Sequence, residues 1–212
     1  MTDAPLHRLE LYFDFSSPFA YLGAAKAPAV AAAHGLRVEW RPFLLGGLFR
    51  AIGTPDVPLF AMPAAKQRHV ANDLRRWARH LGVPYAFPSR FPMSTVMPLR
   101  LAILAGDAAE PFIQRVFRAY LSEDRDIASP DVLAELAEEV GLPRHLVEQT
   151  GEPDVKARLR SATAEAAAAG VFGAPTFVVH DERHPDAPLL FWGQDRLPMV
   201  DAVLRGFRPS LG

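Results

Sequence analysis

The stretch that decides the fold is Phe13-Asp14-Phe15-Ser16-Ser17-Pro18-Phe19-Ala20-Tyr21. Residues 8–15 alternate between apolar and polar side chains, which is the pattern of a β-strand with one buried face. Pro18 follows almost at once, and proline is well tolerated in the first turn of a helix, where its missing N–H costs nothing. An Ala-rich helix is therefore predicted to begin at Pro18 and to end before Gly35, a favoured residue just beyond a helix end. Ser17 stands at the junction of the strand and this helix.

The rest of the chain has two parts that mix strands and helices, separated by a part that contains helices only. Residues 37–43 alternate like the first strand, which predicts a strand-helix-strand unit with parallel strands. The end of the chain predicts a helix over residues 154–169, a hairpin of strands over 176–180 and 189–192, and a last helix from about Asp195 to Arg205. Helical periodicity marks the middle part, after Pro-rich loops over residues 46–64, and covers residues 65–81, 95–105, 111–122, 131–140 and 144–149.

This order, βαβ…αββα with an all-α insertion, predicts an α/β fold of two parts. Residues 1–46 and 154–212 are expected to form one discontinuous domain, and residues 47–153 a helical insertion. The chain has 212 residues, half of them apolar and 22% charged, which suffices for one globular domain with an inserted subdomain. Its net charge of −1 gives no reason to expect nucleic acid or an anionic membrane as a partner.

Targeting signals and cysteine chemistry are not expected either. No apolar run approaches the roughly 18 residues that a membrane span needs, and Met1–Pro5 does not have the pattern of a signal peptide. The chain has no cysteine, which excludes disulfides, zinc held by cysteine and a redox couple within the protein.

Four stretches, in this order along the chain, carry a resemblance to known enzymes: Tyr12–Tyr21, Ala71–Leu74 with the Arg-Trp helix after it, Val171–Thr176 and Phe191–Leu197. Together they resemble the kappa-class glutathione transferases and the bacterial 2-hydroxychromene-2-carboxylate isomerases. Both are DsbA-like proteins, so the resemblance implies a thioredoxin-like fold interrupted by helices. Thioredoxin folds normally carry Cys-X-X-Cys where this chain has Ser17-Pro18-Phe19-Ala20. The resemblance therefore implies a borrowed thiol, that of glutathione.

Ser17 is the expected catalytic residue. A helix N-terminus carries free N–H groups and a partial positive charge, which favour an anion and lower the pKa of a thiol placed there. A hydroxyl at that point can donate a charge-assisted hydrogen bond to the thiolate. The matching serine of the resembled family activates the glutathione sulfur. The alternative is that Ser17 only caps the helix; its neighbour Ser16 lies one residue away from the family's position.

The resemblance also implies where glutathione is held. Ala174-Pro175 matches a cis-proline turn, whose exposed backbone would pair with the cysteinyl unit; the alternative is an ordinary trans proline that begins a strand. Gln194 and Asp195 match the residues that take the γ-glutamyl end, although Asp195 in the first turn of a helix also favours the helix dipole. Arg196 is expected to form a salt bridge.

Thr54 and Lys66 fall where kappa-class proteins place an asparagine and a lysine near glutathione. Threonine is a departure from that pattern, and Lys66 can equally be a solvated helix residue. For the substrate carboxylate, the resembled isomerases use a lysine that aligns with Phe49. Arg50 could take this role only if the Pro/Gly-rich loop shifts by one residue. If Phe49 faces the pocket instead, the pocket is apolar and favours neutral electrophiles.

Two other groups of residues carry weaker signals. The run Arg75, Arg76, Arg79 and His80 is interpreted as a solvated helix face rather than a nucleic-acid site. His180 and His184 flank a polar turn over residues 181–188, and no metal site is predicted there.

The expected function is therefore a glutathione-dependent isomerase of the 2-hydroxychromene-2-carboxylate isomerase type, which acts on a conjugated aromatic acid. The first alternative is a kappa-class-like glutathione transferase that acts on a small electrophile. The second is a cysteine-free DsbA-like protein that binds without catalysis. By analogy with the family we expect a homodimer. The cytoplasm is the expected location, because glutathione is abundant there.

Overall fold

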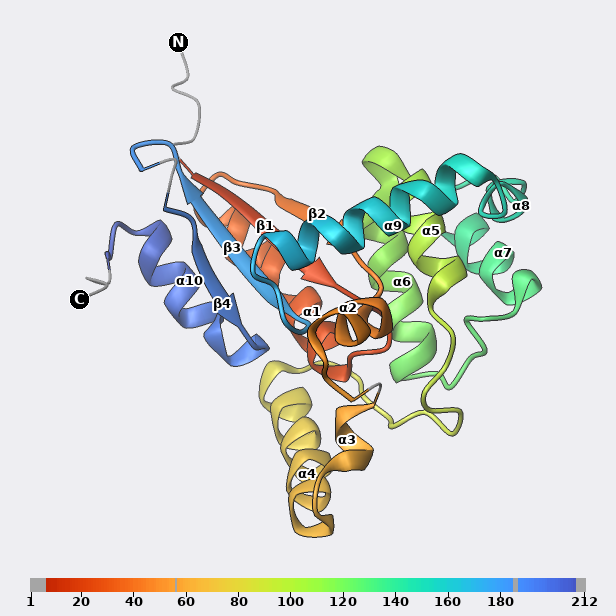
Figure 1. Ribbon diagram of the computed structural model, residues 1–212, viewed down its shortest axis with the longest axis horizontal. Coiled ribbons are helices and arrows are strands. Elements are labelled where there is room, and N and C mark those ends of the chain that lie inside the picture. The colour runs from red at the N-terminus through yellow and green to blue at the C-terminus, as the bar shows by residue number, and fades with distance from the viewer. Residues whose placement is uncertain (1–6, 56, 185–186, 209–212) are drawn as a thin grey trace.

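A mixed four-stranded sheet lies at the centre of the protein, with helices on both of its faces (Figure 1). The computed structural model describes residues 7–55, 57–184 and 187–208. Met1–Pro5, on which the prediction about a signal peptide rests, and residues 185 and 186 of the predicted 181–188 turn lie outside these ranges.

The strand order confirms the predicted strand-helix-strand unit and the predicted hairpin. The sheet runs β2-β1-β3-β4; β1 is parallel to β2 and antiparallel to β3, and β3 is antiparallel to β4. The bounds are β1 (His7–Phe13), β2 (Val38–Pro42), β3 (Thr176–Asp181) and β4 (Leu189–Trp192).

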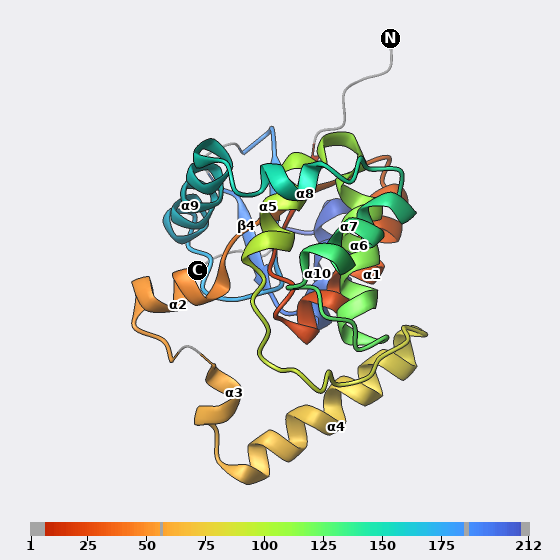
Figure 2. The same ribbon diagram turned by 90° about the vertical axis from the view of Figure 1, so that its right-hand side faces the viewer.

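The helices cover both faces of the sheet and extend beyond one end of it. Helix α10 contacts β3 and α1 on one face, and α9 contacts β2 and α2 on the other. Helices α3 and α4 project away from the sheet (Figures 1 and 2). The bounds are α1 (Pro18–Ala32), α2 (Leu45–Ile52), α3 (Pro58–Ala61), α4 (Ala64–Leu81), α5 (Val96–Leu104), α6 (Ala109–Leu121), α7 (Pro130–Glu139), α8 (Leu146–Gln149), α9 (Pro153–Ala168) and α10 (Leu197–Leu204), with 3-10 turns η1 (Gly106–Ala108) and η2 (Gln194–Arg196). None of the described helices is both long and apolar enough to cross a membrane.

The alternation along β1 places core side chains on both faces of the sheet. Leu11 and Phe13 are fully buried in the larger core, and Tyr12 packs on the opposite face. The larger core continues into the helices, because the ring of Phe117 on α6 lies 5.9 Å from that of Phe13 and 4.8 Å from that of Phe15. The predicted insertion therefore shares its core with the sheet. The division of the chain into a discontinuous domain and a helical insertion remains a proposal. Its predicted boundary, between residues 46 and 47, falls inside α2.

Two helices lie where loops were predicted, over residues 46–64. Residues 45–52 form α2 and residues 58–61 form α3, so the loop prediction is wrong for both segments. Gly46 and Gly47 weaken the local helix signal of α2. The N-terminus of α2 is satisfied from distant parts of the chain: the Asp14 carboxylate accepts the Leu45 N–H at 2.7 Å, and the Thr163 hydroxyl accepts the Leu44 N–H at 3.0 Å. Local sequence patterns contain no trace of such partners.

The last helix begins later than predicted. Residues 194–196 form the 3-10 turn η2, and α10 starts at Leu197 rather than at Asp195. Gly193 precedes the turn with a φ of +111°, a conformation that favours glycine.

A buried polar cluster ties three strands together on the α9 face of the sheet. Glu10 of β1 is only 5% exposed. Its carboxylate accepts hydrogen bonds from Arg41 Nη2 at 2.6 Å, from His180 Nε2 at 3.0 Å and from the Tyr12 hydroxyl at 3.2 Å. Burial alone would raise the pKa of Glu10, but the hydrogen bonds from His180 and Arg41 outweigh it, so this pKa lies below its usual value.

This balance predicts a pH-dependent stability. A carboxyl whose pKa is lower in the folded than in the unfolded state stabilises the fold above its unfolded value of 4.5, and the stabilisation is lost as the pH falls through the folded value. We expect Glu10→Gln to lower the free energy of unfolding by about 1.5–3 kcal/mol at pH 7. The difference in this free energy between variant and wild type should narrow below about pH 4.5. Urea unfolding across this pH range measures both, and a gap that stays constant down to pH 3 would contradict the prediction.

Candidate functional site

The hydroxyl of Ser17 links the opening stretch of the fold, Phe13–Tyr21, to the turn at Ala174-Pro175. Its Oγ accepts the Ala20 N–H at 3.1 Å. Ser17 therefore does cap α1, the role that the alternative interpretation gave it. The same hydroxyl donates to the carbonyl oxygen of Ala174 at 2.7 Å, across 157 residues of chain. Ser17 is 7% exposed and sits where the N–H groups and the dipole of α1 favour an anion. The oxygen that caps α1 therefore also lies at the end of the helix that favours an anion.

The turn before β3 presents backbone groups beside Ser17. The Ala174-Pro175 bond is cis, which confirms the prediction for this turn. The Ala174 carbonyl accepts from Ser17 and keeps a second lone pair, while the Ala174 N–H takes part in no hydrogen bond between described residues. A donor and an acceptor on one residue are what an extended peptide needs for pairing.

An apolar cavity of about 420 Å³ opens next to Ser17. Phe49, Phe91 and Trp192 are among its largest walls, and no charged side chain is among the described residues that line it. Ser16 and Thr54 line it beside Ser17; the contact of Thr54 with glutathione stays a prediction. A cavity of this kind suits an apolar ring compound.

The structure decides between Phe49 and Arg50. Phe49 is 7% exposed and lines the cavity, whereas Arg50 is exposed and is not among the lining residues. Because both residues lie on α2, the register cannot shift by one residue as it could in a loop. Arg50 as the partner of a substrate carboxylate in this cavity is therefore wrong.

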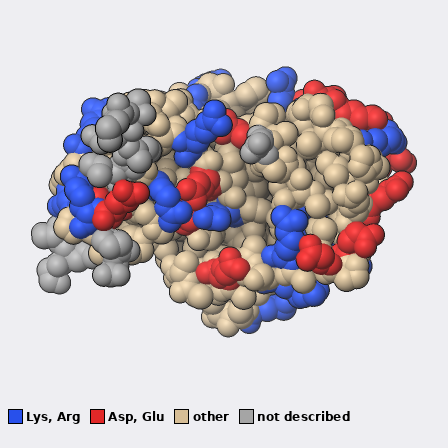
Figure 3. All heavy atoms as spheres, turned by 90° about the horizontal axis from the view of Figure 1, so that it is seen from above, with Lys and Arg blue, Asp and Glu red and all other residues tan. Residues whose placement is uncertain are grey.

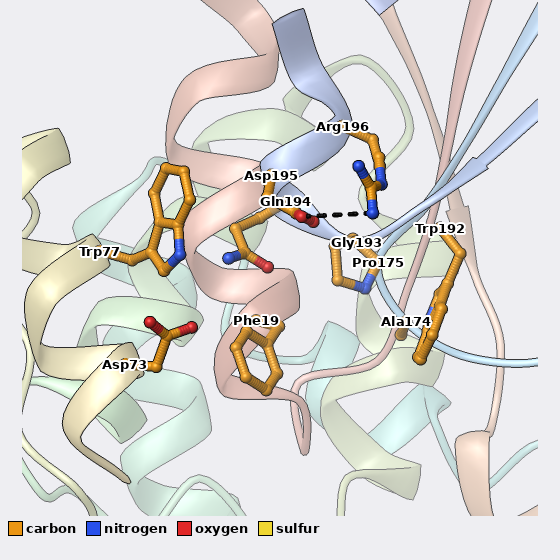
Figure 4. Close-up of a pocket in the computed structure, with 10 residues that line it drawn as sticks. All are labelled: Phe19, Asp73, Trp77, Ala174, Pro175, Trp192, Gly193, Gln194, Asp195 and Arg196. Atoms are coloured by element: carbon orange, nitrogen blue, oxygen red, sulfur yellow. Dashed lines mark ion pairs between the residues drawn. The ribbon is translucent and has the colours of Figure 1, made fainter. Parts of the chain in front are cut away.

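A second pocket, of about 250 Å³, shares Phe19, Ala174 and Trp192 with the apolar cavity (Figure 4). We call it the polar pocket, because it also carries the charged and amide side chains described next. Gln194 and Asp195 of η2 line it, as does Asp73 of α4. Gln194 is 6% exposed, and its amide makes no hydrogen bond with described residues. Asp195 forms the expected ion pair with Arg196, at 3.6 Å, but both side chains are more than a third exposed, which makes the pair weak. Two carboxylates and a free amide suit a zwitterionic amino-acid group.

Lys66 stands apart from both cavities. It is exposed in the first turn of α4 and is absent from the described residues that line either one. The structure therefore supports its interpretation as a solvated helix residue.

Asp14 and Asp73 contribute to the site, although sequence reasoning assigned them no role. Asp14 is 1% exposed and accepts the N–H groups of Ser16 at 3.0 Å and of Leu45 at 2.7 Å. Burial raises the pKa of Asp14. This carboxyl group ties the Ser17 turn to α2 and so places Phe49. Asp14 stands in the opening stretch and Asp73 in the Ala71–Leu74 stretch, so the motifs held the signal, but only the fold shows what each side chain faces.

The remaining candidates stay outside the site. Arg75, Arg76, Arg79 and His80 are exposed, as predicted for a solvated helix face. His180 contacts Glu10. Within the described part of the chain, no group of three or more His, Asp or Glu could hold a metal ion. Figure 3 shows acidic and basic side chains interspersed over most of the face that it presents.

Comparisons with known proteins agree with this fold. The model of the DSBA-like thioredoxin domain family matches residues 8–205. A 2-hydroxychromene-2-carboxylate isomerase of Sphingobium xenophagum is 32% identical over 197 residues, which cover 92% of this chain and 97% of that protein. Human glutathione S-transferase kappa 1 is 26% identical and covers 94% of this chain and 92% of its own length. A solved 2-hydroxychromene-2-carboxylate isomerase superposes with a TM-score of 0.79 at 26% identity, over 93% of this chain and 94% of that one.

Gly193 offers a test of how tightly the polar pocket is built. A Cβ at this position would lie 2.5 Å from Asp195 Oδ1, in a backbone conformation that side chains rarely adopt. We expect Gly193→Ala to lower the free energy of unfolding by about 1–3 kcal/mol and to displace Asp195. Thermal unfolding measures the first effect. Gly206→Ala is the control: it also has a positive φ but nothing within 4 Å. Equal losses in both variants would show that backbone strain alone matters.

Proposed function

We propose that this protein, which belongs to the DsbA-like thioredoxin family, is a glutathione-dependent isomerase of the 2-hydroxychromene-2-carboxylate isomerase type. The observation that carries the proposal is the Ser17 hydroxyl at the N-terminus of α1, beside the Ala174 carbonyl and at the mouth of an apolar cavity. The chain has no thiol of its own to place there. Relatives 32% and 28% identical that carry this isomerase name favour the reaction type.

Glutathione fits the groups that the site leaves free. The N–H and the second lone pair of Ala174 would take its cysteinyl backbone. Gln194 would take the γ-glutamyl carboxylate, and Asp195 and Asp73 its ammonium. Asp195 now contacts Arg196 weakly, so its carboxylate is available. Thr54 lies in the apolar cavity and is better placed against the acceptor than against the glutamyl end.

Ser17 acts through the direction of its proton. In the structure the hydroxyl donates to Ala174, and rotation about its C–O bond would turn the same proton toward an anion at the end of α1. Ala20 would keep its hydrogen bond to the Ser17 oxygen during this rotation, because that bond uses a lone pair. Ser17 can thus stabilise a thiolate without giving up its role as the helix cap.

The reaction type follows from the thiol and the cavity. When bound, glutathione supplies a thiolate that adds reversibly to a conjugated acceptor, whose double bond becomes a rotatable single bond until the thiolate leaves again. Phe49, Phe91 and Trp192 would contact an apolar ring of the acceptor. On the family resemblance alone, we also propose a homodimer in the cytoplasm that takes part in aromatic degradation.

A glutathione transferase is the second candidate, and one observation favours it. Phe49 lines the apolar cavity beside Ser17, which we call the acceptor cavity. None of the described residues that line this cavity is charged, which suits a neutral electrophile. A transferase would use the same Ser17 and keep the adduct as its product.

The role of Ser17 predicts a shift in the titration of bound glutathione. A charge-assisted hydrogen bond contributes about 1.5–3 kcal/mol, which corresponds to a thiol pKa about one to two pH units lower. We expect the bound thiol to titrate well below free glutathione in the wild type and to return most of the way in Ser17→Ala. The ultraviolet absorbance of the thiolate, followed against pH, measures this.

Asp195→Asn is the matched control for this experiment. It should raise the dissociation constant for glutathione about 10- to 150-fold, while the bound thiol still titrates low at saturation. A bound thiol that titrates like free glutathione in the wild type would refute the role of Ser17.

The choice of reaction needs a direct comparison of substrates. We expect turnover of 2-hydroxychromene-2-carboxylate, dependent on glutathione and without net consumption of it. Turnover of a neutral chloronitrobenzene alone would instead identify a transferase. Glutathione binding without turnover of either compound would identify a binding protein.

A further inference from the structure

A third cavity, of about 360 Å³, adjoins the acceptor cavity. It lies along α3, α4 and the loop after α4, in the part that projects from the sheet in Figures 1 and 2. The two cavities share four lining residues, Leu59, Val70, Leu74 and Phe87. A ligand in either cavity would therefore contact the same four side chains. We call this third cavity the Arg75 compartment.

The Arg75 compartment differs from the acceptor cavity in its charge. Arg68 and Arg75, two turns apart on the same face of α4, both line it, and no acidic side chain is among its described lining residues. Neither arginine forms an ion pair with a described carboxylate; Arg75 has one long hydrogen bond, 3.4 Å, to Asn72. Two uncompensated positive charges beside an apolar surface are complementary to an apolar anion.

The hydroxyl of Tyr85 is the second polar feature of the Arg75 compartment. This oxygen is buried and has no hydrogen-bond partner among the described residues, and an unpartnered buried hydroxyl calls for an explanation. Burial raises the pKa of Tyr85 to about 12, and the nearby Arg75 charge opposes this shift. Tyr85 is therefore a neutral donor at physiological pH, close to Arg75.

We infer that the Arg75 compartment binds the carboxylate of an apolar, ring-containing acid. Arg75 pairs with the carboxylate, and Arg68 adds positive charge. The Tyr85 hydroxyl is covered in this structure, so it donates a hydrogen bond to the carboxylate only after the side chains over it move aside. Leu74 and Phe87 hold the ring. The link of this site to catalysis rests on the proposed function. An acidic acceptor needs a cationic partner, and the Arg75 compartment supplies it where Arg50 does not. The binding itself does not depend on glutathione.

The test compares an aromatic acid with its neutral match. The full chain without glutathione is titrated calorimetrically with 2-naphthoate and with 2-naphthamide. We expect the wild type to prefer the naphthoate. Because Arg75 is exposed, Arg75→Gln should weaken naphthoate binding about 2- to 5-fold and leave naphthamide binding unchanged. Tyr85→Phe should weaken naphthoate binding by a smaller factor, and the loss of an unpartnered hydroxyl should not harm folding.

Three controls separate this site from its neighbours. Arg76→Gln changes an exposed arginine next to Arg75 that is not among the lining residues, and it should bind like the wild type. Ser17→Ala should also bind naphthoate normally, so a failure of the glutathione proposal and a failure of this one are told apart. Equal wild-type affinity for the acid and the amide, or a preference that survives Arg75→Gln, would overturn the inference. So would a preference that is lost in Arg196→Gln instead.

Discussion

The hydrogen bond from Ser17 to Ala174 is the constraint on which the site depends. It links the N-terminus of α1 to the cis-proline turn, and so fixes the relative position of two backbone segments 157 residues apart. The Ser17 segment directly follows β1, and the Ala174 segment directly precedes β3. These two strands are antiparallel neighbours in the sheet. The pairing of β1 with β3 thus brings the two turns together, and the hydroxyl holds them at hydrogen-bond distance. An anion bound there meets a helix dipole, a hydroxyl and a backbone amide at once.

The buried carboxyl group of Asp14 extends this order to the acceptor cavity. It holds the Ser16 N–H on one side and the Leu45 N–H on the other. These bonds join the turn that carries Ser17 to the helix that carries Phe49. The cavity wall is therefore set by the same few residues that set the anion site. Buried polar groups of this kind keep their place because losing one partner leaves the others unsatisfied.

Much of the fold could be predicted because its signals are local. Alternation in residues 8–15 and 37–43 gave β1 and β2, and Pro18 marked the start of α1. Helix α2 was missed because its N-terminal partners, Asp14 and Thr163, come from distant parts of the chain. Among the site residues, Ser17, Ala174, Pro175, Gln194 and Asp195 came from motifs and line the two cavities, and Thr54, which came from a family position outside the motifs, also lines one of them. Lys66 and Arg50 do not, because a short motif says nothing of the direction in which a helix presents its side chains.

By itself, the sequence determined all four described strands and most of the helices, the serine at the helix end and the absence of a protein thiol, since each depends on residue type and local spacing. Only the tertiary structure decided which side chains share a cavity. The register of α2 turned Phe49 inward and Arg50 outward, and the folding of α4 beside η2 set Asp73 on the same pocket as Asp195. The same helix set Arg75 near Tyr85. These placements depend on how whole elements pack: α4 packs into the larger core through Leu74, and α2 packs into the smaller core on the other face of the sheet through Leu48.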